Sequence, residues 1–562
     1  MKACQNCSQE FKIEPGDREF YARLSVPEPT LCPQCRLQRR LAFRNERSLY
    51  RRACDLCRKE IIAIYPAKTA FPVYCTDCWW SDAWDASSFG RDYDLTRGFF
   101  EQYRELSEQV PRLGMPSPSN NYNSAYTSWI DECKNCYLVF GSSKCEDASY
   151  AELLYACKNS LDSTNCNGIE LSYGCVNSKN CYQTVWGINS VNCNDCFFCF
   201  DCRSSNNCFL SYNLRHKSYC ILNQQYSPEE WKKRVSEITG SHEKMAEALG
   251  EFKKIIKEKA LHRFANFVQC VNSTGNDLIE SKNARYCFDS SKLEDCSYVS
   301  YGDKIKDCMD CYATVEKSEL CYENFSTRVT ARSRFVIGGW DSNFDISYSQ
   351  FVVGSQNLFG CMALRNKSFC ILNKQYKKEE YEELAKKIIA DMKERGEYGE
   401  FFPISLSPFG YNETLANDYF PMKKEEVVAK SWPWREERGG IFGQESVKAG
   451  SLPDHIRDVK DSILGEILAC ETCGKNYRII ESELGFYRKL SLPLPRKCPD
   501  CRYYERLSFR NPRKLWRRSC RCDKAAHQHH AGVLCSNEFE TSYAPERPEM
   551  VYCEQCYLRE VV

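Results

Sequence analysis

The chain has 562 residues, with 77 basic and 76 acidic side chains and a formal net charge of +1. Such a chain is too long for a single hydrophobic core, so about three to five domains are expected. The balanced charge excludes a global field that selects nucleic acid or membrane, so any such preference must come from local clusters. No apolar run of about 18 residues and no export signal is found, which predicts a cytoplasmic protein.

The 38 cysteines fall into three groups: eight before residue 80, twenty-one between 133 and 370, and nine after 469. In a long chain without an export signal, metal ligation or packing explains cysteines better than disulfides do. The terminal groups are built from widely spaced CxxC pairs, whereas the middle cysteines recur at regular separations along the chain. We therefore expect two different uses of cysteine.

The first group lies in a predicted N-terminal double zinc module with a helix, residues 1–118. CxxC pairs stand 24 residues apart in the first quartet and 17 apart in the second. Two knuckles that each carry two thiolates suit a tetrahedral zinc ion. The predicted ligands are Cys4, Cys7, Cys32 and Cys35 in one site, and Cys54, Cys57, Cys75 and Cys78 in the other. The second knuckle runs into a helix without breakers, as in a treble-clef finger.

Residues 119–226 are rich in Asn, Ser, Tyr and Cys and lack helical periodicity. Cysteine separations of 21 residues recur there, as do separations of 9 and 12. This pattern predicts a β-solenoid whose cysteines stack in a dry interior. The run "CNDCFFCFDC", Cys193–Cys202, also resembles part of an iron–sulfur motif, so a cluster or extra metal is the alternative there.

The middle is doubled, because "HKSYCILNQQY" at 216–226 returns as "NKSFCILNKQY" at 366–376. We expect a helical segment over 227–265, interrupted near residues 239–241, a second solenoid half over 266–376, and a further helix over 377–398. These helices are predicted to cap the open ends of the coils. Residues 399–466, with five prolines and many aromatics, are expected to form a connector that lies on a surface.

The C-terminal double zinc module is predicted over 467–562. Its stretch 486–520 matches 20–54 without a gap at 20 of 35 positions. The spacing of its last site leaves open which two of Cys520, Cys522, His527, His529, His530 and Cys535 complete it. The candidate ligands are Cys470, Cys473, Cys498, Cys501, Cys520, Cys522, His529, Cys535, Cys553 and Cys556, for a total of about four structural zinc ions in the chain.

Arginines follow the second knuckle of both modules at intervals of three or four residues. An arginine-rich helical face can bind phosphates through bidentate contacts. The alternative is that these side chains pair with carboxylates of the chain itself. The candidate nucleic-acid contacts are Arg36, Arg40, Arg44, Arg47, Arg51, Arg502, Arg506, Arg510, Arg513 and Arg517.

The phrases "SLSPFGYNET", "VYCTDCWWSDAWD", "PDHIRDVKDSIL" and "FETSYAPERPEMVYCEQCY" resemble segments of the large uncharacterised zinc-ribbon proteins of candidate-phyla-radiation bacteria. The resemblance spans most of the chain. It implies zinc and a bacterial cytoplasm, and it implies no activity.

These features predict a mainly β protein. Its core is a doubled, right-handed parallel β-helix-like solenoid with about 21 residues per coil and capping helices, flanked by treble-clef or zinc-ribbon modules at both ends. The predicted function is a non-enzymatic zinc-binding scaffold that presents basic modules to RNA or a nucleoprotein. A zinc-dependent self-assembly protein that forms homo-oligomers is the alternative. A carbohydrate enzyme using acids such as Asp162, Glu170, Asp195 and Asp201 is the third possibility, and no membrane partner is expected.

Overall fold

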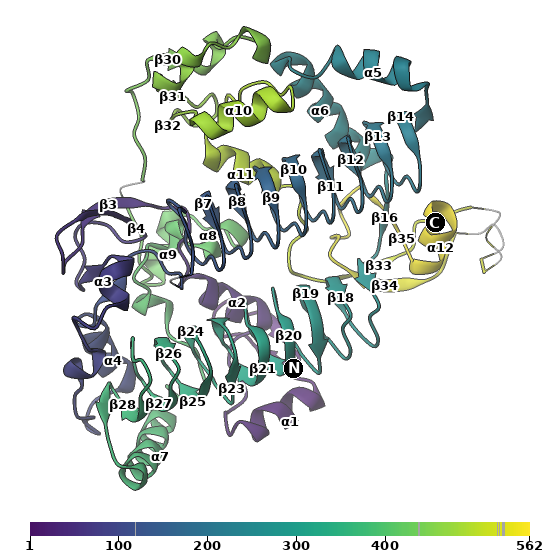
Figure 1. Cartoon of the computed structure of the whole chain (residues 1–562). Coiled ribbons are helices and arrows are strands. Elements are labelled where there is room, and N and C mark those ends of the chain that lie inside the picture. Colours follow the sequence, from purple (N-terminus) through teal and green to yellow (C-terminus); the bar gives the residue numbers. More distant parts are fainter. Residues whose placement is uncertain (119, 437–438, 525–526, 528, 531–533) are drawn as a thin grey trace. The chain divides into compact units, whose positions relative to one another are not determined.

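The computed structural model describes residues 1–118, 120–436, 439–524, 527, 529–530 and 534–562 (Figure 1). The chain divides into two compact units. Unit 1 consists of Met1–Met115, Ala265–Arg438 and Arg513–Leu515, and unit 2 of Pro116–Phe264, Gly439–Pro512 and Trp516–Val562. Each unit thus combines one terminal cysteine module with the half of the middle that is farther from it in sequence. Among the described residues, no helix is long and apolar enough to cross a membrane.

The first half of the middle is a stack of short parallel strands in unit 2, here called ladder A (Figure 1). Consecutive strands are neighbours. The pairing is parallel except for the last pair, in which β14 (Ser218–Ile221) lies antiparallel to β15 (Gln224–Gln225). The strands are β7 (Tyr137–Phe140), β8 (Ser149–Glu152), β9 (Lys158–Leu161), β10 (Glu170–Tyr173), β11 (Val185–Ile188), β12 (Phe197–Phe200), β13 (Asn206–Phe209), β14 (Ser218–Ile221) and β15 (Gln224–Gln225).

The repeat length of ladder A is twelve residues. The backbone of Tyr137 pairs with that of Ser149. At the corners of the chain, which are the residues with positive φ, the Asn135 amide donates a hydrogen bond to the Asp147 carboxylate across the same interval of 12. Outside the named strands, parallel bridges at the same interval recur every three residues, beginning with Tyr122↔Lys134 and Ala125↔Tyr137. The chain therefore returns over itself every twelve residues, and the predicted period of 21 is wrong.

A three-residue unit explains the error. In ladder A every third residue, from Asn123 to Leu222, has a positive φ near 50°. Asn, Asp and Gly recur at these corners because they tolerate the left-handed region best. Because interior positions recur every three residues, cysteines can be separated by any multiple of three, including 9, 12 and 21. The cysteine separations therefore indicated the three-residue unit and not the length of the repeat.

One residue of each three-residue unit faces the interior, and this position holds mostly Cys, Ser, Thr or Ala. The interior thiols are hydrogen-bonded: Cys181 Sγ donates to the carbonyl oxygen of Ser190 at 3.5 Å, and Ser178 Oγ donates to that of Gly187 at 2.8 Å. Cys and Ser therefore satisfy equivalent carbonyls in a narrow interior where short side chains predominate, with Ile130, Leu154 and Ile169 as longer exceptions. Burial raises the pKa of Cys175 to about 12, which keeps its thiol protonated.

The second half of the middle, ladder B, belongs to unit 1. Its pairing interval is mostly twelve residues, as in Gly275↔Cys287 and Gln356↔Ser368, and is thirteen for some pairs, such as Ile305↔Ser318 after a register shift. Its strands are β17 (Phe267–Val268), β18 (Gly275–Ile279), β19 (Cys287–Glu294), β20 (Asp303–Met309), β21 (Val315–Tyr322), β22 (Phe325–Thr327), β23 (Thr330–Ala331), β24 (Ile337–Trp340), β25 (Asn343–Ser347), β26 (Gln350–Val353), β27 (Gln356–Phe359), β28 (Ser368–Ile371) and β29 (Lys374–Gln375).

Each repeat of a ladder is here called a rung. Helices follow the last rung of each ladder, as the sequence predicted. In unit 2, α5 (Pro228–Ser236) and α6 (His242–Glu258) are separated by the expected interruption, and Ser227 and Ser241 cap their first turns. The Trp231 ring of α5 packs on Tyr219 of β14. In unit 1, α7 (Lys378–Glu394) places the Tyr381 ring against Phe369 of β28. Both contacts cover the last rung of a ladder.

The terminal modules have matching element orders. The N-terminal module contains β1 (Lys2–Ala3), β2 (Glu10–Phe11), α1 (Pro15–Arg23), α2 (Pro33–Leu41), β3 (Tyr50–Ala53), β4 (Glu60–Ala63), β5 (Val73–Tyr74) and α3 (Thr76–Trp80), followed by α4 (Phe99–Ser107) and β6 (Arg112–Leu113). The C-terminal module contains β31 (Leu468–Ala469), β32 (Asn476–Tyr477), α10 (Glu481–Lys489), α11 (Pro499–Leu507), β33 (Trp516–Ser519), β34 (Glu538–Thr541), β35 (Met550–Tyr552) and α12 (Glu554–Val561).

Aromatic residues of the predicted connector are buried, as expected for a segment that lies on a surface. Phe401 and Phe402 belong to unit 1 and contact Phe43. The connector contains α8 (Leu415–Tyr419), α9 (Lys424–Ala429) and β30 (Val447–Lys448), whereas β16 (Leu261–Arg263) precedes ladder B and pairs with β35.

Substitution of an interior cysteine tests the packing of ladder A. Cys175→Ser is expected to cost less than about 1.5 kcal/mol, because Ser already occupies equivalent positions, whereas Cys175→Leu should cost about 1–3 kcal/mol by overpacking. Urea denaturation of both variants measures the difference. Equal destabilisation by the two substitutions would contradict the narrow interior.

Candidate metal centres

Four groups of cysteines bring their sulfur atoms within 4.8 Å of one another. Three are the quartets predicted from spacing: Cys4, Cys7, Cys32 and Cys35; Cys54, Cys57, Cys75 and Cys78; and Cys470, Cys473, Cys498 and Cys501. All 38 cysteines lie within the described residues, and none of them forms a disulfide. Each quartet can hold one metal ion with four thiolate ligands.

The fourth quartet consists of Cys520, Cys535, Cys553 and Cys556, all of them buried. Of the six candidates that the sequence left open, Cys520 and Cys535 are the two that form a group with both Cys553 and Cys556. Cys522 and His529, also proposed as ligands, lie outside this quartet. His529 Nε2 is nevertheless 3.2 Å from Cys556 Sγ and 3.8 Å from Cys535 Sγ, so the imidazole borders the site.

The same local geometry builds all four quartets. The third cysteine of each is the N-cap of a helix: Cys32 of α2, Cys75 of α3, Cys498 of α11 and Cys553 of α12. The predicted connection from knuckle to helix is therefore present. A helix N-terminus favours negative charge, although burial outweighs this at Cys75 and Cys498, whose pKa values are raised.

Backbone N–H groups donate to the first cysteine of the quartets. The N–H of Cys75 donates to Cys54 Sγ at 3.2 Å, and the same bond joins Cys32 to Cys4 and Cys553 to Cys520. Burial opposes ionisation of Cys54, but these donors outweigh it and lower its pKa to about 7. The pKa of Cys470 falls to about 7 by the same balance. The thiolate, which is the form that binds metal, is thus accessible near neutral pH at Cys54 and Cys470.

The middle cysteines are arranged differently. In the run that resembled a cluster motif, Cys193 Sγ donates to the carbonyl oxygen of Cys202 at 3.3 Å, and Cys196 Sγ to that of Ser205 at 3.5 Å. Cys199 and Cys202 also donate to carbonyls nine residues ahead. The four thiols are therefore used as hydrogen-bond donors inside ladder A, which supports the packing interpretation over a cluster.

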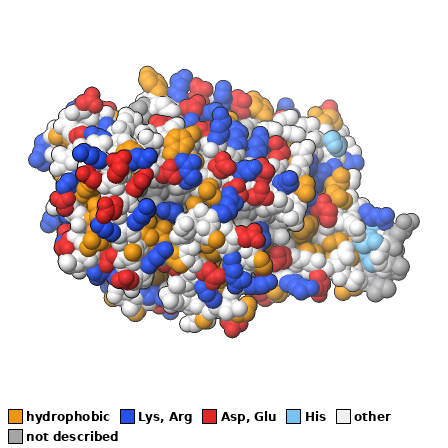
Figure 2. Space-filling model, turned by 90° about the horizontal axis from the view of Figure 1, so that it is seen from below, with side chains coloured by type: hydrophobic (Ala, Val, Ile, Leu, Met, Phe, Trp, Pro, Cys, Tyr) orange, Lys and Arg blue, Asp and Glu red, His pale blue; other side chains and the backbone are white. Residues whose placement is uncertain are grey.

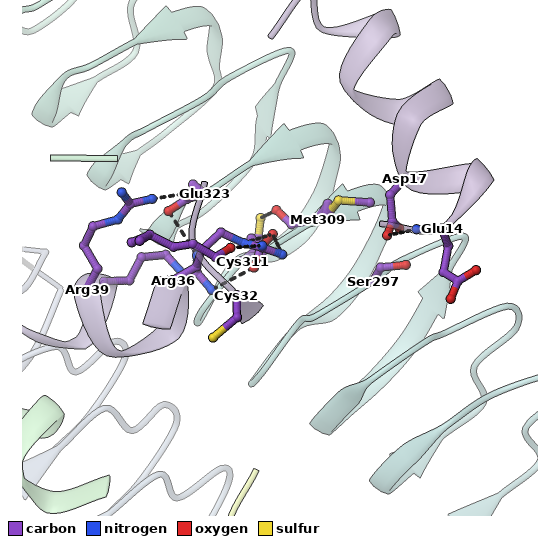
Figure 3. Close-up of polar contacts among 12 residues, drawn as sticks. Glu14, Asp17, Cys32, Arg36, Arg39, Ser297, Met309, Cys311 and Glu323 are labelled. Atoms are coloured by element: carbon purple, nitrogen blue, oxygen red, sulfur yellow. Dashed lines mark hydrogen bonds and ion pairs between the residues drawn. The ribbon is translucent and has the colours of Figure 1, made fainter. Parts of the chain in front are cut away.

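The arginines that were expected to bind phosphate are mostly buried within their own unit, where several pair with carboxylates of the chain, as the alternative expected. Arg36, Arg40, Arg44, Arg502, Arg506 and Arg513 are each at most 5% exposed. In unit 1, Arg36 Nε donates to Asp310 Oδ2 at 2.9 Å, and Arg40 Nη2 donates to Asp310 Oδ1 at 3.3 Å. Figure 3 shows Arg36 and Arg39 of α2 directed at ladder B, where Arg39 also pairs with Glu323 at 2.7 Å.

Unit 2 repeats this arrangement with α11 and ladder A. Arg506 Nη1 lies 2.7 Å from Asp162 Oδ1, and Arg502 Nη1 lies 3.1 Å from both Asp162 Oδ2 and Glu483 Oε1. Asp162 and Asp310 are both corner residues with positive φ. In each unit a Tyr lies twelve residues before this Asp, and an arginine lies over its ring. The guanidinium carbon is 4.7 Å from the ring centroid for Arg502 and Tyr150, and 5.4 Å for Arg36 and Tyr298.

The other predicted arginines lie outside these buried pairs. Arg51 and Arg517 have side chains that are 77% and 79% exposed, and they pair at the surface with Glu60 and Glu538. Arg47 and Arg510 are half-buried. Arg44 and Arg513 pair with Glu46 and Asp289 in unit 1.

The acids considered for carbohydrate cleavage are partly committed to structural pairs. Asp162 holds Arg502 and Arg506, and Asp201 pairs with Arg215 at 3.0 Å and accepts a hydrogen bond from the Tyr557 hydroxyl. Sequence reasoning missed the partners of the arginines, although the repeated Arg–x3–Arg spacing after each second knuckle was visible.

Comparisons with known proteins leave the family open. No family model matches the chain, and no curated protein matches it. One similar solved structure is a putative acetyltransferase from Desulfovibrio desulfuricans G20, with 8% sequence identity and a TM-score of 0.10, covering 45% of this chain and 67% of that one. A TM-score at this level supports no statement about fold or activity.

Loss of the corner carboxylate should destabilise unit 2. Asp162→Asn is expected to cost about 3 kcal/mol, because it removes one charge partner from two buried guanidinium groups. Asp147→Asn is the matched control: it changes an exposed corner Asp and should cost under about 0.5 kcal/mol. Urea denaturation measures both.

A second substitution separates charge burial from packing. Adding Arg506→Met to Asp162→Asn should recover part of the lost stability, because the uncompensated charge is removed. If the double variant instead loses the sum of the stabilities lost in the two single variants, the pair contributes packing contacts and not charge compensation.

Proposed function

We propose that this protein is a non-enzymatic zinc-dependent scaffold. In each unit the metal module serves to hold a ladder, rather than to present its arginines to a partner. The observation that carries the proposal is the burial of the arginine pair of α2 or α11 against a corner Asp of the ladder. Four thiolates without an open position match structural zinc sites, and zinc is the metal that such quartets prefer.

The metal supports this contact through the knuckle. The helix that carries the arginine pair begins at Cys32 in unit 1 and at Cys498 in unit 2, and both cysteines belong to a quartet. Metal binding fixes the start of the helix and therefore the direction in which its guanidinium groups point. We propose that the ladders are the coils of the predicted solenoid, with twelve residues in each coil, and that their exposed faces are the surface the scaffold offers.

Zinc content and its removal test this role. The purified chain is expected to contain at least four zinc ions, and chelation should expose α2 and α11 to proteolysis while the ladders resist longer. Limited proteolysis before and after chelation, with zinc added back as the control, measures the effect. A zinc-free protein with unchanged protease resistance would sink the proposal.

RNA binding is a separate proposal, because six of the ten arginines on which it rested are buried. On the face shown in Figure 2, Lys and Arg side chains are interspersed with Asp and Glu. Filter binding with a structured RNA across a salt series tests it. The scaffold proposal expects no tight complex at physiological salt; a tight complex that weakens steeply with salt would favour RNA as the partner.

Self-assembly is a second candidate, favoured by the first rung of each ladder. Tyr122 in ladder A is 69% exposed and Val271 in ladder B is 63% exposed, whereas helices cover the last rungs. An open strand edge with apolar side chains is a surface on which another copy can add.

The oligomeric state tests this candidate. If copies join through the first rungs, the purified protein forms a defined oligomer, and Tyr122→Lys or Val271→Lys converts it to monomer by light scattering. Lys292→Ala, at an exposed corner of ladder B, is the control that should leave the mass unchanged. A monomeric wild-type protein would exclude self-assembly.

A further inference from the structure

A second group of metal-binding side chains lies beside the last quartet. Cys522, His527, His530 and Cys556 also bring one ligand atom each within 4.8 Å of one another. Cys556 belongs to this group and to the quartet of Cys520, Cys535 and Cys553 as well. The two groups therefore meet at a single buried sulfur atom.

We propose that the C-terminal module binds two zinc ions joined by the thiolate of Cys556. A thiolate that has formed one bond to a metal retains lone pairs for a second, so it can bridge two ions. The two ligand sets are then four cysteines for one ion and two cysteines with two histidines for the other. Both combinations are typical of closed structural zinc sites.

The orientation of His527 supports the second site. Its ring is 2% exposed, with Nδ1 lying 3.3 Å from Cys522 Sγ and Nε2 lying 2.9 Å from Glu560 Oε1 of α12. With the proton on Nε2 donated to Glu560, the Nδ1 lone pair points toward Cys522. A carboxylate that holds the far nitrogen of a ligating histidine is the usual second layer of contacts around zinc.

His530 gives the independent observation. Both of its ring nitrogens are buried, and neither has a hydrogen-bond partner among the described residues. A buried imidazole without partners loses the free energy of its hydrogen bonds to water. A zinc ion shared with Cys522 and His527 supplies that partner. His529 Nε2, 3.2 Å from Cys556 Sγ, is placed to donate a hydrogen bond to the bridging thiolate.

Metal content of the full-length protein tests the proposal, which rests on the zinc-binding part of the proposed function. The wild-type chain is expected to carry five zinc ions, and Cys522→Ser and His530→Ala should each carry four. His216→Ala, at an exposed corner of ladder A, is the control and should keep five. Four ions in the wild type, or five in both variants, would overturn the second site. A chain without zinc would overturn the proposed function as well.

Cadmium substitution provides a readout that does not depend on counting. Two cadmium ions joined through Cys556 should give two NMR resonances that are coupled to each other through the shared sulfur. His530→Ala should abolish the coupling and leave the resonance of the four-cysteine site. Uncoupled resonances in the fully loaded wild-type protein would show that the thiolate does not bridge.

Discussion

The structure depends on one kind of buried contact, which occurs once in each unit. In this contact, arginines of a helix form ion pairs with an Asp of that unit's ladder. In both units a pair of arginines four residues apart leaves the helix after a metal knuckle and binds one corner Asp. Burying such charges is costly unless each is paired and hydrogen-bonded. Arg506 meets this condition with Asp162, Thr164 and the Tyr150 carbonyl. The pair therefore fixes the position of the module on its own ladder, because a displaced module would bury charges away from their partners.

The ladder supplies the matching feature through its backbone. A left-handed corner every third residue favours Asn, Asp and Gly, so acids are available at regular positions along the outside. Most of these acids are solvated or bonded to the next rung, as Asp147 is to Asn135. Asp162 and Asp310 differ because an arginine pair covers them. One local rule thus builds the ladder and also provides the charge that the metal module recognises.

The two kinds of cysteine follow from their surroundings. At the knuckles, backbone N–H donors and helix N-termini favour thiolates, and four sulfur atoms converge. In the ladders each sulfur donates to a carbonyl oxygen, and burial raises the pKa of interior thiols such as Cys175. The same residue type can therefore bind metal in the modules and pack in the dry interior of the ladders. The groups that face each sulfur decide which of the two roles it has.

The sequence by itself determined the features that depend on local spacing. The CxxC intervals identified three quartets, and the serine caps and the break near Gly240 located α5 and α6. The repeat length was not accessible in this way, because a three-residue unit permits several cysteine separations and only the pairing of strands selects twelve. The partners of Arg36, Arg40, Arg502 and Arg506, and the selection of Cys520 with Cys535, depend on residues brought together from distant segments. Tertiary structure decided these, because a charge or a ligand is satisfied by proximity in space and not by distance along the chain.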